Sequence, residues 1–149
     1  MGIIVVGGVI EKDGKFLLVQ EAKKPFSGQW NLPAGRLEID ESVFDGAKRE
    51  IEEETGYKVE LTGIVQISNK TLTIESLNVK DSLIRIIFST KILSGDINYN
   101  PSELLAVKWF TYDEILNMKD KLRGSNWIIN AIETVKNNKV QDISIIQLA

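Results

Sequence analysis

The sequence feature that most constrains the fold is an acidic segment in the first half of the chain, GRLEIDESVFDGAKREIEEETGY at Gly35–Tyr57. Within it, Ser42 followed three residues later by Asp45 is typical of a helix start, and Gly56 suits the left-handed residue that follows a helix end. The segment therefore predicts a helix over about 43–55, with a glutamate cluster at its C-terminal end.

The glutamates of this predicted helix do not all face the same way. At about 100° per residue, the apolar stripe that should pack on a sheet consists of Val43, Ala47 and Ile51. Glu50 and Glu54 fall close to this stripe, with Glu53 at its margin. Glu52 falls on the opposite, solvated side. Ionised carboxylates on a packing face are costly, and at a helix C-terminus they also oppose the macrodipole.

Two interpretations of the acidic cluster remain at this point. A run such as REIEEE is typical of a solvated helix face, and charge alone favours that interpretation. A divalent cation held between the inward carboxylates would instead relieve their repulsion, with Arg49 orienting one of them through a bidentate contact. The inward placement of Glu50 and Glu54 favours the metal site, whereas Glu52 fits the solvated face.

The composition limits the chemistry that these carboxylates can support. The chain has no cysteine and no histidine, which excludes disulfides, thiolate nucleophiles, Ser-His and Cys-His catalysis and the usual zinc sites. Any metal should therefore be a hard, oxygen-binding cation such as Mg²⁺, with Mn²⁺ as a substitute. The net charge of −3 is too small to favour nucleic acid or an acidic membrane as a partner.

Length and hydropathy predict one domain over residues 1–149, because 149 residues are the size of one typical domain. No apolar run approaches the roughly 18 residues of a membrane span. The start, MGIIVVGGVIEKDGK, has neither the basic region nor the cleavage site of a signal peptide. We therefore expect a cytoplasmic protein without a membrane partner. The sequence predicts no particular oligomeric state.

The pattern of the remaining elements predicts the fold class. β-Branched and apolar stretches predict strands at 3–10, 16–20, 59–68, 83–93 and 104–110, with the polar stretch TLTIESLNVKDS as a hairpin tip or loop. A short extended piece is expected at 30–33. Thr111 with Glu114 predicts a short helix over 112–118, and Ser125 or Asn126 would cap a helix that runs to about 137. The tail VQDISIIQLA fits either a strand or an irregular strip. This order predicts an α/β protein with a mixed sheet flanked by helices.

The acidic segment also resembles a known motif. Its fixed residues and their spacing are Gly35, five residues, Glu41, seven residues, Arg49-Glu50-Ile51, one residue, Glu53-Glu54, one residue and Gly56. This pattern resembles the Nudix box, with Tyr57 where the family usually has an aliphatic residue. The stretches WNLPAGRLE and SELLAVKWFTYDEI are similar to the family as well. The resemblance implies the Nudix fold, an α/β/α sandwich around a mixed β-sheet, and hydrolysis of a nucleoside diphosphate linked to another group.

The resemblance further implies roles for individual residues. The groups that correspond to metal ligands or water-positioning groups are the Gly35 carbonyl, Glu50, Glu53 and Glu54. Glu41 would act through water, and Glu103 is the candidate for the distant glutamate that many members bring from a later loop. The alternative for Glu103 is an exposed loop residue without a function. Either Glu50 or Glu53 would act as general base for in-line attack of water on phosphorus, since no histidine is present.

The expected substrate is a small nucleoside di- or triphosphate or a similar pyrophosphate. The stretches LLVQEAKKPFSGQWNLPAGRLE and IRIIF resemble a subgroup that acts on nucleotides, thiamine-precursor pyrophosphates and oxidised guanine nucleotides. Residues 71–75 lack the proline or tyrosine typical of members that act on ADP-ribose or dinucleoside polyphosphates, so these rank lower. Lys24, Arg36 and Arg85 are expected to contact phosphate, and Phe26 and Trp30 to stack on a base. The alternative is that these five are surface charges and core aromatics.

Two other functions stay open from the sequence. One is a Nudix-like module that binds a nucleotide or RNA without cleaving it, and the other is an interaction protein in which the acidic helix is only structural. Modules that do not cleave usually lose glutamates of the box, and this chain keeps all of them. The sequence therefore favours the hydrolase.

Overall fold

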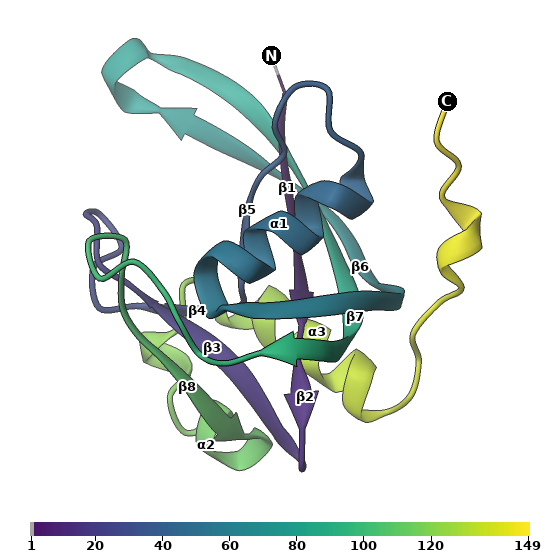
Figure 1. Cartoon of the computed structure of the whole chain (residues 1–149). Coiled ribbons are helices and arrows are strands. Elements are labelled where there is room, and N and C mark those ends of the chain that lie inside the picture. The colour runs from purple at the N-terminus through teal and green to yellow at the C-terminus, as the bar shows by residue number, and fades with distance from the viewer. Residues whose placement is uncertain (1) are drawn as a thin grey trace.

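Two β-sheets lie between helices in the computed structural model, which describes residues 2–149 (Figure 1). The strands are β1 (Ile3–Val9), β2 (Glu11–Lys12), β3 (Lys15–Glu21), β4 (Trp30–Asn31), β5 (Ala34–Arg36), β6 (Tyr57–Ile74), β7 (Val79–Gly95) and β8 (Leu104–Thr111). The α-helices are α1 (Val43–Thr55), α2 (Tyr112–Leu116) and α3 (Ser125–Lys136), and short 3₁₀ turns lie at Glu75–Leu77, Lys119–Lys121 and Ile143–Ile145. In this described part of the chain, no helix is long and apolar enough to cross a membrane.

The two sheets differ in strand direction. The first has the order β5-β1-β7-β6, and it is mixed because β1 runs parallel to β7 while the other pairs are antiparallel. The second is antiparallel, with β3 pairing with β2, β4 and β8. Strand β5 is the edge strand beside β1, with Gly35 opposite Val6, and it therefore carries Gly35 to the side of the sheet next to α1.

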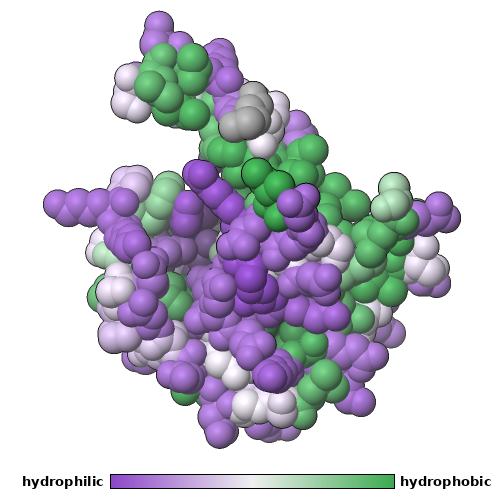
Figure 2. All heavy atoms as spheres, turned by 45° about the horizontal axis from the view of Figure 1, so that its top comes forward, coloured by the Kyte–Doolittle hydropathy of each residue, from purple (hydrophilic) through white to green (hydrophobic). Residues whose placement is uncertain are grey.

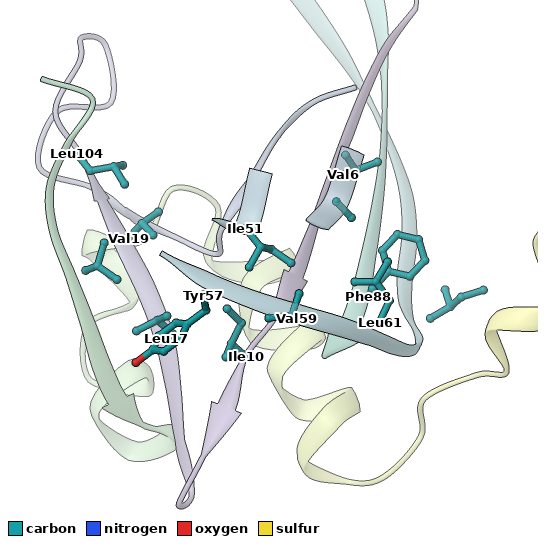
Figure 3. Packing of buried hydrophobic residues seen from close by; sticks show 13 residues of the cluster. Val6, Ile10, Leu17, Val19, Ile51, Tyr57, Val59, Leu61, Phe88 and Leu104 are labelled. Carbon is teal, nitrogen blue, oxygen red and sulfur yellow. The ribbon is translucent and has the colours of Figure 1, made fainter. Parts of the chain in front are cut away.

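Alternation along β3 divides the core into two layers. Leu17 and Val19 belong to the cluster that contains Ile51 of α1, and Figure 3 shows Ile51 among cluster side chains from both sheets. Phe16 and Leu18 belong instead to the cluster that contains Ile128 of α3. Because successive side chains of a strand point to opposite faces, one strand can serve both layers. The predicted α/β/α sandwich with a mixed sheet is confirmed.

Helix α1 begins and ends where the sequence predicts. The Ser42 hydroxyl accepts a hydrogen bond from the Asp45 N–H at 3.0 Å. Gly56 adopts φ 84°, and its N–H donates to the Glu52 carbonyl at 2.8 Å. The expected packing face is also present, since Ile51 is fully buried while Glu52 is exposed.

The polar stretch between β6 and β7 forms a hairpin tip, which is one of the two predicted alternatives, and not an irregular loop. Thr71 to Ile74 and Val79 to Ser82 continue the two strands in register, and only the 3₁₀ turn and Asn78 connect them. The resulting two-stranded ribbon extends beyond the rest of the sheet (Figure 1). The two strands continue almost to the turn because the backbone hydrogen bonds of a ribbon form between strands whatever its exposed side chains are.

Two helix predictions also need correction. Helix α2 ends at Leu116, and α3 follows Gly124 without a side-chain cap, so the expected cap by Ser125 or Asn126 is wrong. The short extended piece expected at 30–33 includes the strand Trp30–Asn31. Of the two alternatives for the tail, the irregular strip is found, with an isolated bridge between Gln141 and Ile64.

Two glycines with positive φ should respond differently to alanine. At Gly14 (φ 75°) a Cβ would meet nothing within 4 Å, whereas at Gly56 it would collide with the Asp96 carbonyl and lie 2.7 Å from the Asn98 nitrogen. Gly14→Ala should cost about 1 kcal/mol of unfolding free energy from backbone strain. Gly56→Ala should cost about 2 to 4 kcal/mol, because crowding adds to the same strain. Urea unfolding of both variants measures this difference, and equal losses would contradict it.

Candidate active site

A polar cleft of about 570 Å³ lies where the C-terminal half of α1 faces β5 and the loop before β8. The charged residues that line it are Glu21, Glu50, Glu53, Glu54, Glu103 and Arg123. Figure 2 shows hydrophilic residues across the middle of one face, and hydrophobic residues on the ribbon that projects beside them. The cleft thus brings Glu103 together with three glutamates of α1, although it lies far from them in the sequence.

Glu50 and Glu54 lie one helical turn apart on α1, and both reach strand β5. The Glu50 carboxylate lies so close to Gly35 that a Cβ on residue 35 would collide with it, so any larger residue there would require the Glu50 side chain to move. The Glu54 Oε1 accepts a hydrogen bond from the Ala34 N–H at 2.8 Å. These contacts fix the two carboxylates against the backbone segment that holds the Gly35 carbonyl.

Arg49 contacts two of the glutamates that line the cleft, Glu50 and Glu53, and one outside it, Glu41. Its Nε and Nη2 donate to the two oxygens of Glu41 at 3.0 and 2.6 Å. Its Nη1 donates to Glu50 Oε1 at 2.8 Å and lies 3.3 Å from Glu53 Oε2. Its Nη2 also donates to the Arg36 carbonyl at 3.1 Å. The bidentate contact that the sequence suggested for Arg49 is therefore made to Glu41, which lines no part of the cleft.

The carboxylates around the cleft differ in their electrostatic environment. Hydrogen bonds from Arg49 lower the pKa of Glu41 to about 2. Burial raises the pKa of Glu50, although Arg49 partly opposes this effect. Burial raises the pKa of Glu54 well above its usual range, and the hydrogen bond from Ala34 offsets only part of that rise. Added positive charge in the cleft would favour the ionised forms of Glu50 and Glu54.

The donor atoms of the cleft fit a hard divalent cation. They are carboxylate oxygens, and such oxygens are the ligands that Mg²⁺ and Mn²⁺ prefer. Within residues 2–149, no group of three acidic side chains already stands at ligand spacing around one point. In this arrangement Glu50 and Glu53 accept hydrogen bonds from Arg49, and Glu54 accepts one from the Ala34 N–H.

The other residues singled out by sequence are divided between two pockets and the rest of the molecule. Phe26, Arg36 and Arg85 line a second pocket of about 560 Å³. Trp30 is only 8% exposed and packs edge-on against Phe110, with ring centroids 4.9 Å apart. The expected stacking of Trp30 on a base is therefore wrong, because its ring is part of the core. Lys24 is exposed and lines neither pocket.

Comparison with known proteins identifies the fold and the motif together. The protein-family model of the NUDIX domain matches residues 2–130 of this chain, which include the acidic segment and every strand. The chain belongs to the Nudix family. A Nudix hydrolase structure from Nitrosomonas europaea matches the whole chain and 98% of its own with a TM-score of 0.84 and 28% identity.

Curated relatives of this Nudix chain are longer than it is. A Caenorhabditis elegans relative is 36% identical over 118 residues, which are 78% of this chain and 30% of the relative. The ADP-ribose pyrophosphatase of Methanocaldococcus jannaschii is 31% identical over 63% of this chain and 53% of its own length. A mouse relative named 8-oxo-dGDP phosphatase NUDT18 is 27% identical over 72% of this chain and 31% of its own length.

Two charged residues of the Nudix cleft were not expected from the sequence. Arg123 Nη1 lies 3.1 Å from Glu21 Oε1, and its guanidinium lies 3.7 Å from the centroid of the Phe26 ring. Glu21 ends strand β3, after the apolar run FLLV, and a polar residue at a strand end was the only feature of the sequence that could have indicated a functional role for it. Arg123 gave no such signal, because it lies in a loop that reaches the cleft only through the tertiary fold.

The raised pKa of Glu54 predicts a pH-dependent gain in stability for Glu54→Gln in EDTA. Below about pH 4.5 the carboxyl is protonated in both folded and unfolded chains, so ionisation costs nothing there. As the pH rises from there, the unfolded chain loses this proton before the folded chain does, and the wild type loses stability. Glu54→Gln should therefore become more stable than the wild type by at least about 1 kcal/mol at pH 7.5.

Urea unfolding of the two proteins at a series of pH values measures the effect. Glu52→Gln is the matched control, because Glu52 is exposed and its nearest cation, Lys58, lies 4.0 Å away. A constant difference between Glu54→Gln and wild type from pH 4.5 to 7.5 would show that burial does not perturb Glu54.

Proposed function

We propose that this Nudix chain hydrolyses a pyrophosphate bond in a small nucleoside di- or triphosphate or a similar pyrophosphate, with Mg²⁺ or Mn²⁺ as cofactor. The observation that carries the proposal is the convergence of Glu50, Glu53 and Glu54 with Glu103 in one cleft. A solvated helix face would not enclose carboxylates or place one of them against a glycine.

These side chains are suited to hydrolysis of a pyrophosphate bond by water. A divalent cation held by Glu50, Glu53, Glu54 and the Gly35 carbonyl would supply positive charge to the diphosphate and polarise the attacking water. The water oxygen attacks phosphorus, the bond from phosphorus to the bridging oxygen breaks, and the proton of the water passes to Glu50 or Glu53. Arg49 acts as a positioning residue, because its hydrogen bonds reach Glu50 and Glu41. Glu103 would complete the cleft from the opposite loop.

The names of the relatives support a diphosphate as the group that is cleaved. ADP-ribose and 8-oxo-dGDP both contain a diphosphate attached to a nucleoside. The second pocket adjoins the cleft through Ala34 and Arg123, so it can hold the part of the substrate remote from the bond that breaks. We therefore favour a purine nucleoside diphosphate, including an oxidised one, over a thiamine-type pyrophosphate. The archaeal relative makes ADP-ribose a necessary member of any substrate panel.

Glu54→Gln should lower kcat by at least about two orders of magnitude, because it removes a carboxylate from the proposed metal site. Glu52→Gln should change kcat less than about twofold, since Glu52 is on the solvated side of the same helix. Steady-state kinetics on the best substrate, with circular dichroism to verify folding, measures both. If the two variants behave alike, the assignment of helix faces to chemistry is wrong.

A panel of nucleoside di- and triphosphates, ADP-ribose and thiamine diphosphate tests the activity itself, with orthophosphate and pyrophosphate measured separately. We expect turnover with Mg²⁺ or Mn²⁺, none in EDTA, and orthophosphate from a purine nucleoside diphosphate. The position of the diphosphate relative to the fixed carboxylates selects the bond that breaks, and near-attack geometry makes that selection steep.

Three outcomes of the panel would be decisive. Full turnover in EDTA would exclude the metal-dependent mechanism. Pyrophosphate from triphosphates, with every diphosphate intact, would exclude the expected product while leaving a hydrolase. Binding without any cleavage would indicate a Nudix-like module that only binds its nucleotide.

A further inference from the structure

Lys23 holds the side chain of Glu103 through an ion pair at the rim of the acidic cleft. Its Nζ donates to Glu103 Oε1 at 2.7 Å, although the two residues lie 80 positions apart in the chain. In the described part of the chain, Oε2 of the same carboxylate accepts no hydrogen bond. Glu103 lines the cleft, whereas Lys23 does not. One carboxylate oxygen is therefore anchored outside the cleft, and the other is available to a ligand within it.

The backbone holds the two segments that carry these side chains together. At the end of β3, Glu21 stands opposite Leu104 of β8. One residue further along, the Ala22 N–H donates to the Glu103 carbonyl at 3.2 Å. Figure 1 shows β3 and β8 side by side. The ion pair of Lys23 thus continues a ladder that the two strands already form, so the distance that its side chain must span is fixed by the fold.

This ion pair is too exposed to contribute much to the stability of the fold. The side chain of Lys23 is 66% exposed and that of Glu103 is 53% exposed, and water and salt screen pairs of this kind. The pair does restrict the direction of the Glu103 carboxylate, because an unpaired glutamate side chain samples several rotamers. Its effect should therefore be found in what Glu103 binds, and not in unfolding.

We propose that Lys23 is a positioning residue for the metal site, and that it acts by orienting Glu103 toward a divalent cation in the cleft. Partners that hydrogen-bond to a ligating carboxylate fix its orientation, and their loss lowers metal affinity. Lys23 suits this role because its ammonium takes up one oxygen of Glu103 from outside the cleft. This inference rests on the proposed function, in which Glu103 completes the cleft that holds the cation.

The direction of the effect separates this role from a general effect of charge. Removing a lysine near the acidic cleft makes the cleft more negative, which by itself leaves cation binding unchanged or makes it tighter. Removing the lysine that orients Glu103 should instead make cation binding weaker. Lys24 is the matched control, because it is the next residue, is exposed and lines neither the cleft nor the second pocket.

Mn²⁺ binding to the whole chain tests the proposal, measured by isothermal titration calorimetry without substrate. Lys23→Met should weaken binding by about three- to tenfold, the low end for a partner of a ligating carboxylate, because the pair is exposed. Lys23→Arg keeps a charged donor for Glu103 and should bind within about twofold of the wild type. Lys24→Met should bind as tightly as the wild type or more tightly. Circular dichroism and urea unfolding verify that each variant is folded.

A double-mutant cycle with Glu103→Gln shows whether Lys23 acts through Glu103. Glu103→Gln should itself weaken Mn²⁺ binding, and adding Lys23→Met to it should cause no further weakening. Unchanged or tighter binding by Lys23→Met alone would overturn the proposal. Weakening of the same size by Lys24→Met, or by Lys23→Met in the Glu103→Gln chain, would overturn it as well.

These results can be separated from the test of hydrolysis. If the wild type binds Mn²⁺ and Lys23→Met binds it equally well, the role of Lys23 is refuted and the hydrolase is not. If the expected losses are found in a chain that cleaves nothing in the substrate panel, the role of Lys23 is supported and the hydrolase is refuted. A wild type that binds no Mn²⁺ would refute both the metal site and the role of Lys23.

Discussion

The contacts of the Arg49 guanidinium join the three segments that make up the Nudix site. It holds Glu41 in the loop before α1, Glu50 on α1 itself and the Arg36 carbonyl on β5. Arg49 and its carboxylate partners Glu41 and Glu50 are largely enclosed, with side chains 23%, 16% and 14% exposed. Partly buried ions of this kind are tolerated only when each has a partner, so helix, loop and edge strand must keep their relative positions. The bidentate geometry with Glu41 makes arginine, and not lysine, suited to this place.

That arrangement places negative charge where the fold alone would not favour it. Helix α1 ends with glutamates at the negative end of its dipole, and burial further raises the pKa of Glu50 and Glu54. The glutamates of α1 therefore lower the local stability of the helix, and they also give the cleft a negative charge that attracts cations. A site that is locally unfavourable and globally enforced is typical of function, because the surrounding structure must fix what the local sequence opposes.

The cleft and the pocket beside it differ in the sign of the charges that line them. The cleft is lined by five glutamates and one arginine, whereas the adjoining pocket has three arginines and no acidic side chain among its described lining. Arg123 belongs to both, and its contact with Glu21 lies at their boundary. A nucleotide has the same division, with a diphosphate that needs cations at one end and a flat base with polar edges at the other. The ribbon of β6 and β7 supplies part of the apolar lining of the adjoining pocket, through Leu72, Ile74 and Leu83.

The sequence by itself determined the acidic helix, both of its ends and the faces of its glutamates. These features depend on caps and on the 3.6-residue period, which are set by residues within a few positions of one another. Only the tertiary structure decided that Trp30 is buried against Phe110, that the polar stretch near Glu75 continues as a ribbon, and that Arg123 reaches the cleft. Each of these depends on contacts between segments distant in the chain, and no local pattern records which segments will meet.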